Sequence, residues 1–185
     1  MKILKFGGTS VGSVQSITTL LGIVKAEVDK GEKPVVVLSA MSGVTNLLIN
    51  MAEEAAKGNE FTAQLAELER RHFEVVKSLL DIQNQNPAFT RLKIHFNQLE
   101  ELLHGVLTLR ELTLKTRDLI ISYGERCSTI MIAKIAAQHF ANAFFVDASD
   151  VIKTDNAFGQ AKVNTGLSEL LIRDLHSLIG NLTLA

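Results

Sequence analysis

At 185 residues, the chain is long enough to form one domain with a substantial core. Its 46% hydrophobic and 21% charged residues are typical of a globular protein, and a formal net charge of −1 gives no electrostatic reason to bind nucleic acid or a membrane surface. No apolar run approaches the roughly 18 residues of a membrane span, no secretory signal is visible, and the only cysteine, Cys127, has no internal partner, so we expect a cytoplasmic protein.

The first predicted element is a short buried strand over residues 3–6, which runs into a glycine-rich loop. Residues 7–12 read GGTSVG, and a helical pattern begins near Val14. Glycine amides approach a ligand closely, and with the positive end of the next helix they form an anion site, beside which Lys5 offers a mobile charge. The order and spacing exclude a Walker A loop and a dinucleotide fingerprint. An ordinary tight turn with an exposed lysine explains the same residues.

A helix is predicted over residues 15–30, where apolar residues recur at helical spacing, and Gly31 is a suitable residue to end it. Pro34 restarts the chain in an extended form, and the apolar run at 35–38 predicts a strand buried on both faces. Strand, helix and strand form a βαβ unit, so the first two strands should pair in parallel.

The second loop, residues 39–46, follows the carboxyl end of this strand, which is the edge where open α/β sheets bind ligands. Its sequence SAMSGVTN carries three hydroxyl groups and a glycine into a helix predicted from Leu47 to about Lys57. Ser42 and Thr45 could simply cap that helix.

Residues 60–110 carry apolar residues every three to five positions, with a polar break at 83–87. This pattern predicts a long antiparallel helical hairpin, with the charged cluster at 67–71 on its solvated face. His72, His95 and His104 lack the spacing of zinc ligands. No chemistry is visible in the hairpin, and a role as a lid or in oligomerisation is the modest expectation.

Residues 122–125 read SYGE and lead into a helix predicted from Glu125 to His139. A glutamate in the first turn of a helix complements the helix dipole. Cys127 in this helix is expected to be a small buried hydrophobe rather than a nucleophile. A third strand at 143–147, an amphipathic helix at 167–179 and the start of another strand at 181–185 complete the prediction.

Three of these strings together resemble aspartokinases, which belong to the amino-acid kinase superfamily. The strings are KFGGTSV at 5–11, SAMSGVTN at 39–46 and SYGE at 122–125, and they occur in the family's order. The resemblance runs nearly end to end, although Ser149 stands where arginine is common. It implies an α/β fold, a three-layer αβα sandwich with a mostly parallel sheet that is incomplete here. The helical hairpin at about 60–110 corresponds to an insertion in that fold.

The resemblance implies transfer of the ATP γ-phosphoryl group to the β-carboxylate of L-aspartate, with Mg²⁺ assisting. The product, 4-phospho-L-aspartate, leads to lysine, threonine and methionine. The resemblance assigns the catalytic charge to Lys5 and the aspartate contacts to Ser39, Thr45 and Glu125. It assigns phosphate binding to Lys5, Phe6, Gly7, Gly8, Thr9 and Ser10. No residue is expected to bind a metal directly, and the full-length protein is expected to be a homo-oligomer.

The strings that complete the family's nucleotide pocket do not occur in residues 1–185. We therefore expect these residues to be the N-terminal, substrate-binding part of a kinase domain in a larger protein, either monofunctional or fused to a homoserine dehydrogenase. Such a part should be inactive alone. Two alternatives stay open: a related amino-acid kinase for another substrate, and a non-catalytic part that only binds aspartate or assembles with another chain.

Overall fold

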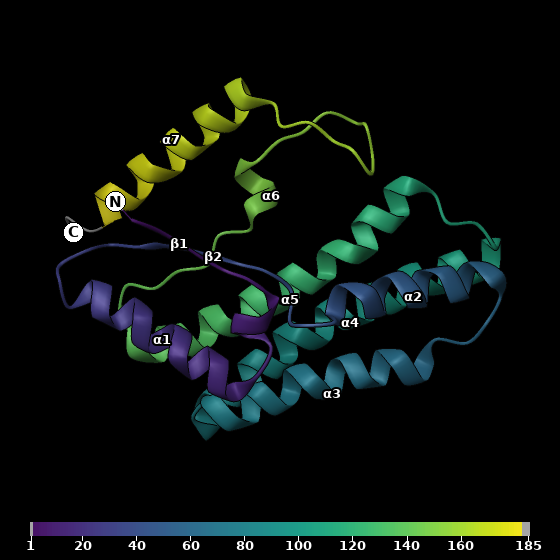
Figure 1. Ribbon diagram of the computed structural model, residues 1–185, viewed down its shortest axis with the longest axis horizontal. Coiled ribbons are helices and arrows are strands. Elements are labelled where there is room, and N and C mark those ends of the chain that lie inside the picture. Colours follow the sequence, from purple (N-terminus) through teal and green to yellow (C-terminus); the bar gives the residue numbers. More distant parts are fainter. Residues whose placement is uncertain (1, 183–185) are drawn as a thin grey trace. The chain divides into compact units, whose positions relative to one another are not determined.

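The computed structural model describes residues 2–182, with side chains through residue 177, and divides the chain into two compact units (Figure 1). The first unit is Met1–Phe144 and the second is Phe145–Ala185. The first contains β1 (Ile3–Phe6), the 3₁₀ helix η1 (Gly8–Val11), α1 (Val14–Val28), β2 (Val35–Leu38), α2 (Val44–Lys57), α3 (Thr62–Leu79), α4 (Ile82–Leu109) and α5 (Leu114–His139). The second contains α6 (Ala148–Val151) and α7 (Thr165–Leu182).

β1 and β2 pair in parallel, with Ile3 opposite Val35 and Phe6 opposite Leu38, as the βαβ pattern predicts. The strand predicted at 143–147 is wrong, because that segment is irregular and the sheet has two strands within the described residues. An apolar run indicates only that a segment suits a half-buried pleated surface, whereas a strand needs a neighbour for its backbone hydrogen bonds.

Burial of β2 on both faces is also wrong. Val35 and Val37 are each 45% exposed, whereas Val36 and Leu38 are half-buried. Successive side chains of a strand point to opposite faces of a sheet, and α5 packs against β2. The continuous run of valines therefore has one covered face and one open face among the described residues.

α1 begins at Val14 because Ser13 and Ser16 form a capping box. The Ser13 hydroxyl accepts a hydrogen bond from the Ser16 amide, and the Ser16 hydroxyl accepts one from the Ser13 amide. Past the end of the helix, Gly31 has φ of +82°, the left-handed conformation expected of a residue that ends a helix.

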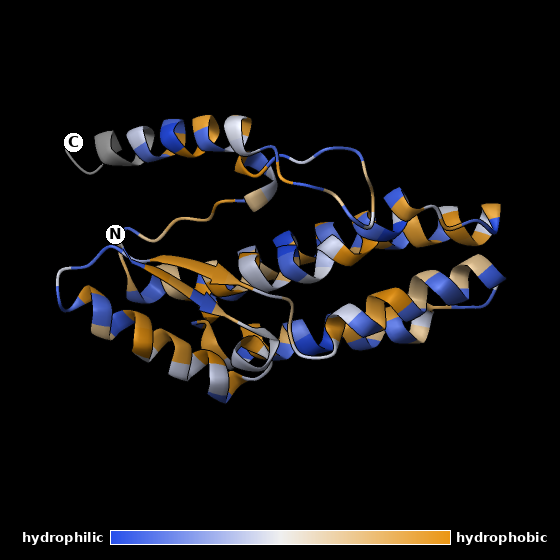
Figure 2. Ribbon diagram, turned by 45° about the horizontal axis from the view of Figure 1, so that its top comes forward, coloured by the Kyte–Doolittle hydropathy of each residue, from blue (hydrophilic) through white to orange (hydrophobic). Residues whose placement is uncertain are grey.

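The main core of the first unit lies among α2, α3, α4 and α5, whose apolar residues face inward (Figure 2). α3 and α4 are the predicted hairpin. The large core side chains that are at most 2% exposed include Leu48, Met51, Leu68, Leu92, Phe96, Leu99, Leu103, Ile120 and Met131. The periodic apolar residues of 60–110 therefore fill this core, as predicted.

The polar break predicted at 83–87 is wrong, because α3 ends at Leu79 and residues 83–87 belong to α4. The polar side chains serve the turn between the helices. Gln85 donates to the Leu80 carbonyl at 2.8 Å, and Gln138 of α5 accepts from the Asp81 amide at 2.9 Å. Pro87 removes one helical hydrogen bond. Burial of Ala88 and the apolar residues that follow it outweighs that loss.

In the second unit, Asp155 organises a turn by accepting hydrogen bonds from the amides of Ala157 and Lys162. α7 contains the whole of the predicted helix at 167–179. The strand predicted from 181 is wrong for 181 and 182, which are helical, and 183–185 lie outside the described residues. None of the described helices combines the length and apolar character that a membrane crossing requires.

Together, the parallel β1–β2 pair and its helices agree with an incomplete αβα fold, and the molecule is mostly helical.

Candidate functional site

The loops that follow β1 and β2 lie against each other at the carboxyl ends of the two strands. The Ser39 amide donates to the Phe6 carbonyl at 3.2 Å, and the Ser42 amide donates to the Gly8 carbonyl at 3.1 Å. Because the strands are parallel, both loops leave the sheet at one edge, where ligands of open α/β sheets bind. The two predicted loops therefore form one continuous surface.

Two glycines permit this close approach. A Cβ atom on Gly8 would lie 3.1 Å from the Ala40 carbonyl oxygen, and one on Gly12 would lie 3.1 Å from the Ser42 Cβ. A side chain at either position would push the loops apart. Gly7 has φ of −81° and ψ of 176°, an extended conformation that any residue adopts.

The Lys5 ammonium lies over the glycine loop. Its Nζ atom is 3.7 Å from the position that a Cβ on Gly7 would occupy. Lys5 is exposed, and no carboxylate of the described residues pairs with it. An unpaired ammonium has three donors to offer, so its place beside the loop suits an anionic ligand.

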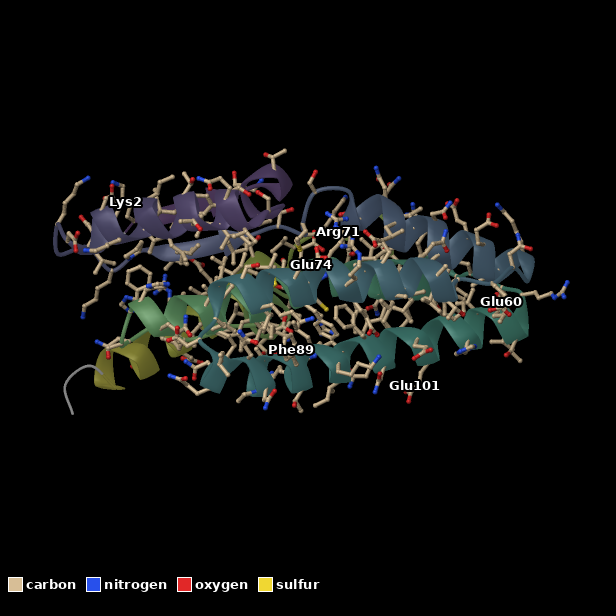
Figure 3. The ribbon with its side chains drawn as sticks, turned by 90° about the horizontal axis from the view of Figure 1, so that it is seen from below. Lys2, Glu60, Arg71, Glu74, Phe89 and Glu101 are labelled. Carbon is tan, nitrogen blue, oxygen red and sulfur yellow. The ribbon has the colours of Figure 1, made fainter. Side chains whose placement is uncertain are left out.

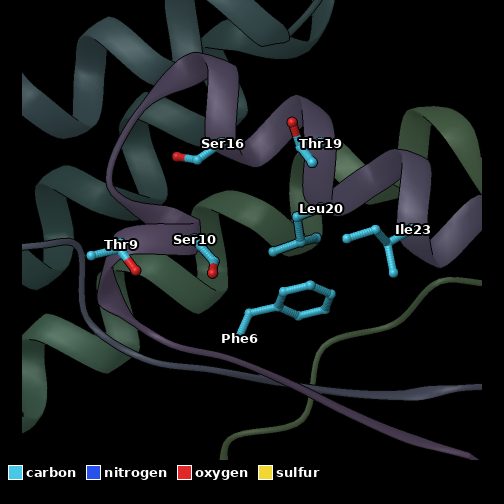
Figure 4. Close-up of a pocket in the computed structure, with 7 residues that line it drawn as sticks. All are labelled: Phe6, Thr9, Ser10, Ser16, Thr19, Leu20 and Ile23. Atoms are coloured by element: carbon cyan, nitrogen blue, oxygen red, sulfur yellow. The ribbon is translucent and has the colours of Figure 1, made fainter.

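The helix end nearest to the glycines is that of η1, not of α1, because η1 begins at Gly8 and the start of α1 is occupied by its own capping box. Thr9 and Ser10 lie on η1. They line an open pocket of about 240 Å³ between η1 and α1 (Figure 4), together with Phe6, Ser16, Thr19, Leu20 and Ile23. Lys5, Ser39, Thr45 and Glu125 do not line this pocket.

Glu125 lies in the middle of α5, so the explanation of this residue by a first-turn helix dipole is wrong. It is half-buried, and its Oε1 atom accepts a long hydrogen bond of 3.4 Å from the Ala40 amide. One turn later, the buried Ser128 hydroxyl donates to the Ser39 carbonyl at 2.7 Å. α5 therefore holds the backbone of the second loop from two positions.

α5 comes this close because Gly124 has no side chain. A Cβ atom there would lie 2.9 Å from the Ala40 Cβ and 3.2 Å from the Leu48 Cδ1. Glycine inside a helix costs about 0.5–1 kcal/mol relative to alanine, and at this position it leaves room for the close approach of α5 to the second loop. Gly124 lets Glu125 reach the loop.

Thr45 is half-buried in the first turn of α2. Gly43, the residue that directly precedes this helix, has φ of +78°. The helix has no side-chain cap, so the capping explanation for Ser42 and Thr45 is wrong. Ser39, Thr45 and Glu125 thus belong to two adjoining segments, the second loop with the start of α2 and the middle of α5.

Cys127 is a buried neighbour of this edge, not a nucleophile, as predicted. Burial raises the pKa of its thiol to about 12, which leaves almost no thiolate at neutral pH.

Sequence patterns missed two residues of the edge, Ser128 and Arg71. Arg71 was assigned to the solvated face of the hairpin, which is wrong, because it is half-buried and its Nη2 atom donates to the Ser42 carbonyl at 2.6 Å. Both residues contact backbone carbonyls that are distant in sequence, and periodicity carries no signal for such contacts.

The chain is similar to a known protein family over most of its length. The model of the amino acid kinase family matches residues 1–180. The chain is 34% identical to Aspartokinase 1, chloroplastic, of Arabidopsis thaliana over 71% of its own length and 22% of that protein. It is 30% identical to Lysine-sensitive aspartokinase 3 of Escherichia coli over 91% of its own length and 36% of that protein.

Among solved structures, the chain resembles E. coli aspartokinase III in complex with aspartate and ADP. The TM-score is 0.83 and the identity is 25%, over 98% of this chain and 39% of that one. The fold prediction is thereby confirmed, and the chain spans only 22–36% of the length of the two relatives. The order of the loops, the parallel sheet edge and the family model give one conclusion: the chain belongs to the amino acid kinase family.

Proposed function

We propose that this chain carries the aspartate-binding side of an aspartate kinase, which transfers the ATP γ-phosphoryl group to the β-carboxylate of L-aspartate. The observation that carries the proposal is the convergence of the glycine loop, the second loop and Glu125 at one sheet edge. The similar E. coli aspartokinase III structure contains aspartate and ADP, which supports these substrates.

In this proposal, Glu125 receives the α-ammonium group of aspartate. Its carboxylate accepts one long hydrogen bond from the Ala40 amide and keeps acceptor capacity for a charged donor. Ser39 and Thr45 hold the rest of the amino acid from the adjoining segment. Because Ser128 and Glu125 both bind the backbone of this segment, the substrate contacts keep fixed relative positions.

Lys5 and the amides of Gly7 and Gly8 receive the phosphoryl group, with Phe6, Thr9 and Ser10 completing the phosphate-binding segment. Lys5 is the residue that stabilises the charge developing during transfer, because its ammonium lies over the glycine loop and pairs with no carboxylate of the described residues. No general base is needed, since a carboxylate acceptor is already ionised at neutral pH.

Mg²⁺ is the expected companion of ATP. Within the described residues, no three His, Cys, Asp or Glu side chains are grouped as the ligands of one metal ion would be. A magnesium ion that is bound mainly through substrate phosphates needs few protein ligands. We assign no step to it. We further propose a cytoplasmic homo-oligomer for the full-length protein, as the family resemblance implies.

The direct test is calorimetric titration of the chain with L-aspartate, with L-glutamate as the competing substrate. Glu125→Gln should raise the Kd for aspartate by about 10–100-fold, because it removes one charge from a charge-assisted pair. The matched control is Glu101→Gln, an exposed glutamate of α4, which should leave the Kd unchanged. Preference for L-glutamate, or equal loss in both variants, would contradict the aspartate assignment.

The role of Lys5 is tested by phosphoryl transfer in a chain with a complete kinase domain. Lys5→Ala should lower kcat by about 10²–10³-fold, with a smaller effect on the KM for aspartate. Lys2→Ala is the control, because Lys2 is exposed near the same strand and pairs with Glu27 at 2.6 Å. Unchanged turnover in Lys5→Ala would show that the glycine loop is only a turn.

A further inference from the structure

Ser42 is the residue at which three segments of the first unit meet. Its amide donates to the Gly8 carbonyl at 3.1 Å, and its own carbonyl accepts from the Arg71 guanidinium at 2.6 Å. The next residue, Gly43, is in the left-handed conformation. The path of the second loop therefore depends on one residue whose amide and carbonyl groups are both hydrogen-bonded to other segments.

The part of α3 that carries Arg71 is packed into the core of the first unit. Arg71 precedes His72 on α3, and His72 is fully buried with its ring 5.4 Å from that of Phe96 on α4. Arg71 is half-buried, and a Cβ atom on Gly43 would lie 4.0 Å from its Nη1 atom. Figure 3 shows Arg71 on α3, one turn before Glu74. The hairpin is thus linked to the loop edge through a side chain whose base is fixed in the core.

The adjacent Arg70 shows what is unusual about Arg71. Arg70 is exposed and pairs with two carboxylates of its own helix, Glu67 and Glu74. Within the part of the chain that the structure describes, Arg71 has no carboxylate at ion-pair distance, and its one hydrogen bond goes to an uncharged carbonyl. Arg71 therefore brings a positive charge without a direct ion pair in the described residues to an edge that faces anionic ligands in the proposed function.

We propose that Arg71 is a positioning residue for the candidate site. Its guanidinium holds the Ser42 carbonyl, and through the Ser42 amide it keeps the second loop in register with the glycine loop. The consequence for aspartate affinity rests on the proposed function, whereas the effect on the loop does not. A side chain of the helical hairpin thereby sets the geometry between Lys5 and Thr45.

The experiment uses the isotope-labelled 185-residue chain and compares Arg71→Met with Arg70→Met, the same substitution one position away. Two signals report on the loop: the ¹³C shift of the Ser42 carbonyl and the hydrogen-exchange rate of the Ser42 amide. In Arg71→Met, we expect the carbonyl signal to move and the amide to exchange about tenfold faster. In Arg70→Met, both should match the unmodified chain. In Arg71→Lys, both signals should lie closer to those of the unmodified chain than in Arg71→Met, because lysine keeps the positive charge and hydrogen-bond donors.

Titration with L-aspartate separates this inference from the proposed function. We expect the Kd to rise about tenfold in Arg71→Met. If the unmodified chain binds no aspartate but Ser42 responds as described, Arg71 is still a positioning residue for the second loop. The assignment of the site to aspartate is then wrong. If Ser42 is unchanged in Arg71→Met, or responds equally in Arg70→Met, positioning is overturned. Should Arg71→Met lose its folded spectrum, the same comparison with Arg71→Gln decides.

Discussion

The helical hairpin and the loop edge are held together in opposite ways. In the hairpin, large side chains fill the space, and the fully buried Phe96 ring lies 5.4 Å from His72 and 5.9 Å from Phe73. At the loop edge, segments meet where side chains are missing, at Gly8, Gly12 and Gly124, and hydrogen bonds to backbone complete the contact. The hairpin should therefore be sensitive to lost atoms, and the loop edge to added ones.

The largest expected effect is the loss of a core ring from the hairpin. Phe96→Ala should lower the free energy of unfolding by about 3–5 kcal/mol, because it removes buried apolar surface and leaves a cavity. Urea denaturation measures this change. Ile94→Ala is the control on the same helix, since Ile94 is 50% exposed and should change stability by about 0.5 kcal/mol or less. Equal losses in the two variants would contradict the packing that we describe.

The buried His72 of the hairpin should make the free energy of unfolding depend on pH. Burial lowers its pKa to about 4, and its Nδ1 atom lies 2.8 Å from the Leu68 carbonyl oxygen. Its Nε2 atom has no hydrogen-bond partner among the residues that the structure describes. The folded protein keeps this histidine neutral down to about pH 4, whereas the unfolded chain takes up a proton near the ordinary value of 6.5. The free energy of unfolding should therefore fall as the pH drops from 6.5 to 4, by on the order of 3 kcal/mol.

Urea titrations at several pH values test the His72 contribution. His72→Met should flatten this part of the pH dependence, because no group remains at this position to be protonated on unfolding. His104→Gln, which changes an exposed histidine of α4, should preserve it. A similar slope in the unmodified chain and in His72→Met would show that other groups carry the pH dependence.

Adding one methyl group tests the loop edge. Gly124→Ala should destabilise the protein by about 1–3 kcal/mol, because the new Cβ would lie 2.9 Å from the Ala40 Cβ. The same change should weaken aspartate binding, since α5 can no longer hold Glu125 at the second loop. Chemical denaturation and calorimetry measure the two effects. A stability gain, as helix propensity alone predicts, would mean that the close approach is not required.

The smallest effect is expected from the same substitution in the hairpin. Gly105 lies inside α4, and apart from its chain neighbours and the backbone of its own helix, no atom of the described residues comes within 4 Å of the position that its Cβ would occupy. Gly105→Ala should therefore raise the free energy of unfolding by about 0.5–1 kcal/mol. If the two substitutions change the free energy of unfolding in opposite directions, the contrast between the two regions is supported. If both raise it or both lower it, the contrast is contradicted.

The hairpin could be predicted because its information is local and periodic. Apolar residues such as Leu92, Leu99 and Leu103 recur at helical spacing, and they occupy the core that this spacing implies. Its internal turn could not be placed, because the residues at 83–87 are typical of a turn and yet lie in α4. Tertiary packing outweighed local propensity there.

The amino-acid sequence by itself determined the parallel β1–β2 pair, the two loops at its carboxyl edge and the family, since these depend on short strings and their order. Only the tertiary structure decided that Glu125 lies in the middle of a helix, that Gly124 brings it to Ala40, and that Arg71 holds Ser42. The physical reason is the kind of contact. A pattern records which residues turn toward a core, whereas a hydrogen bond to a distant carbonyl, or the space left by a missing side chain, exists only once the segments have packed.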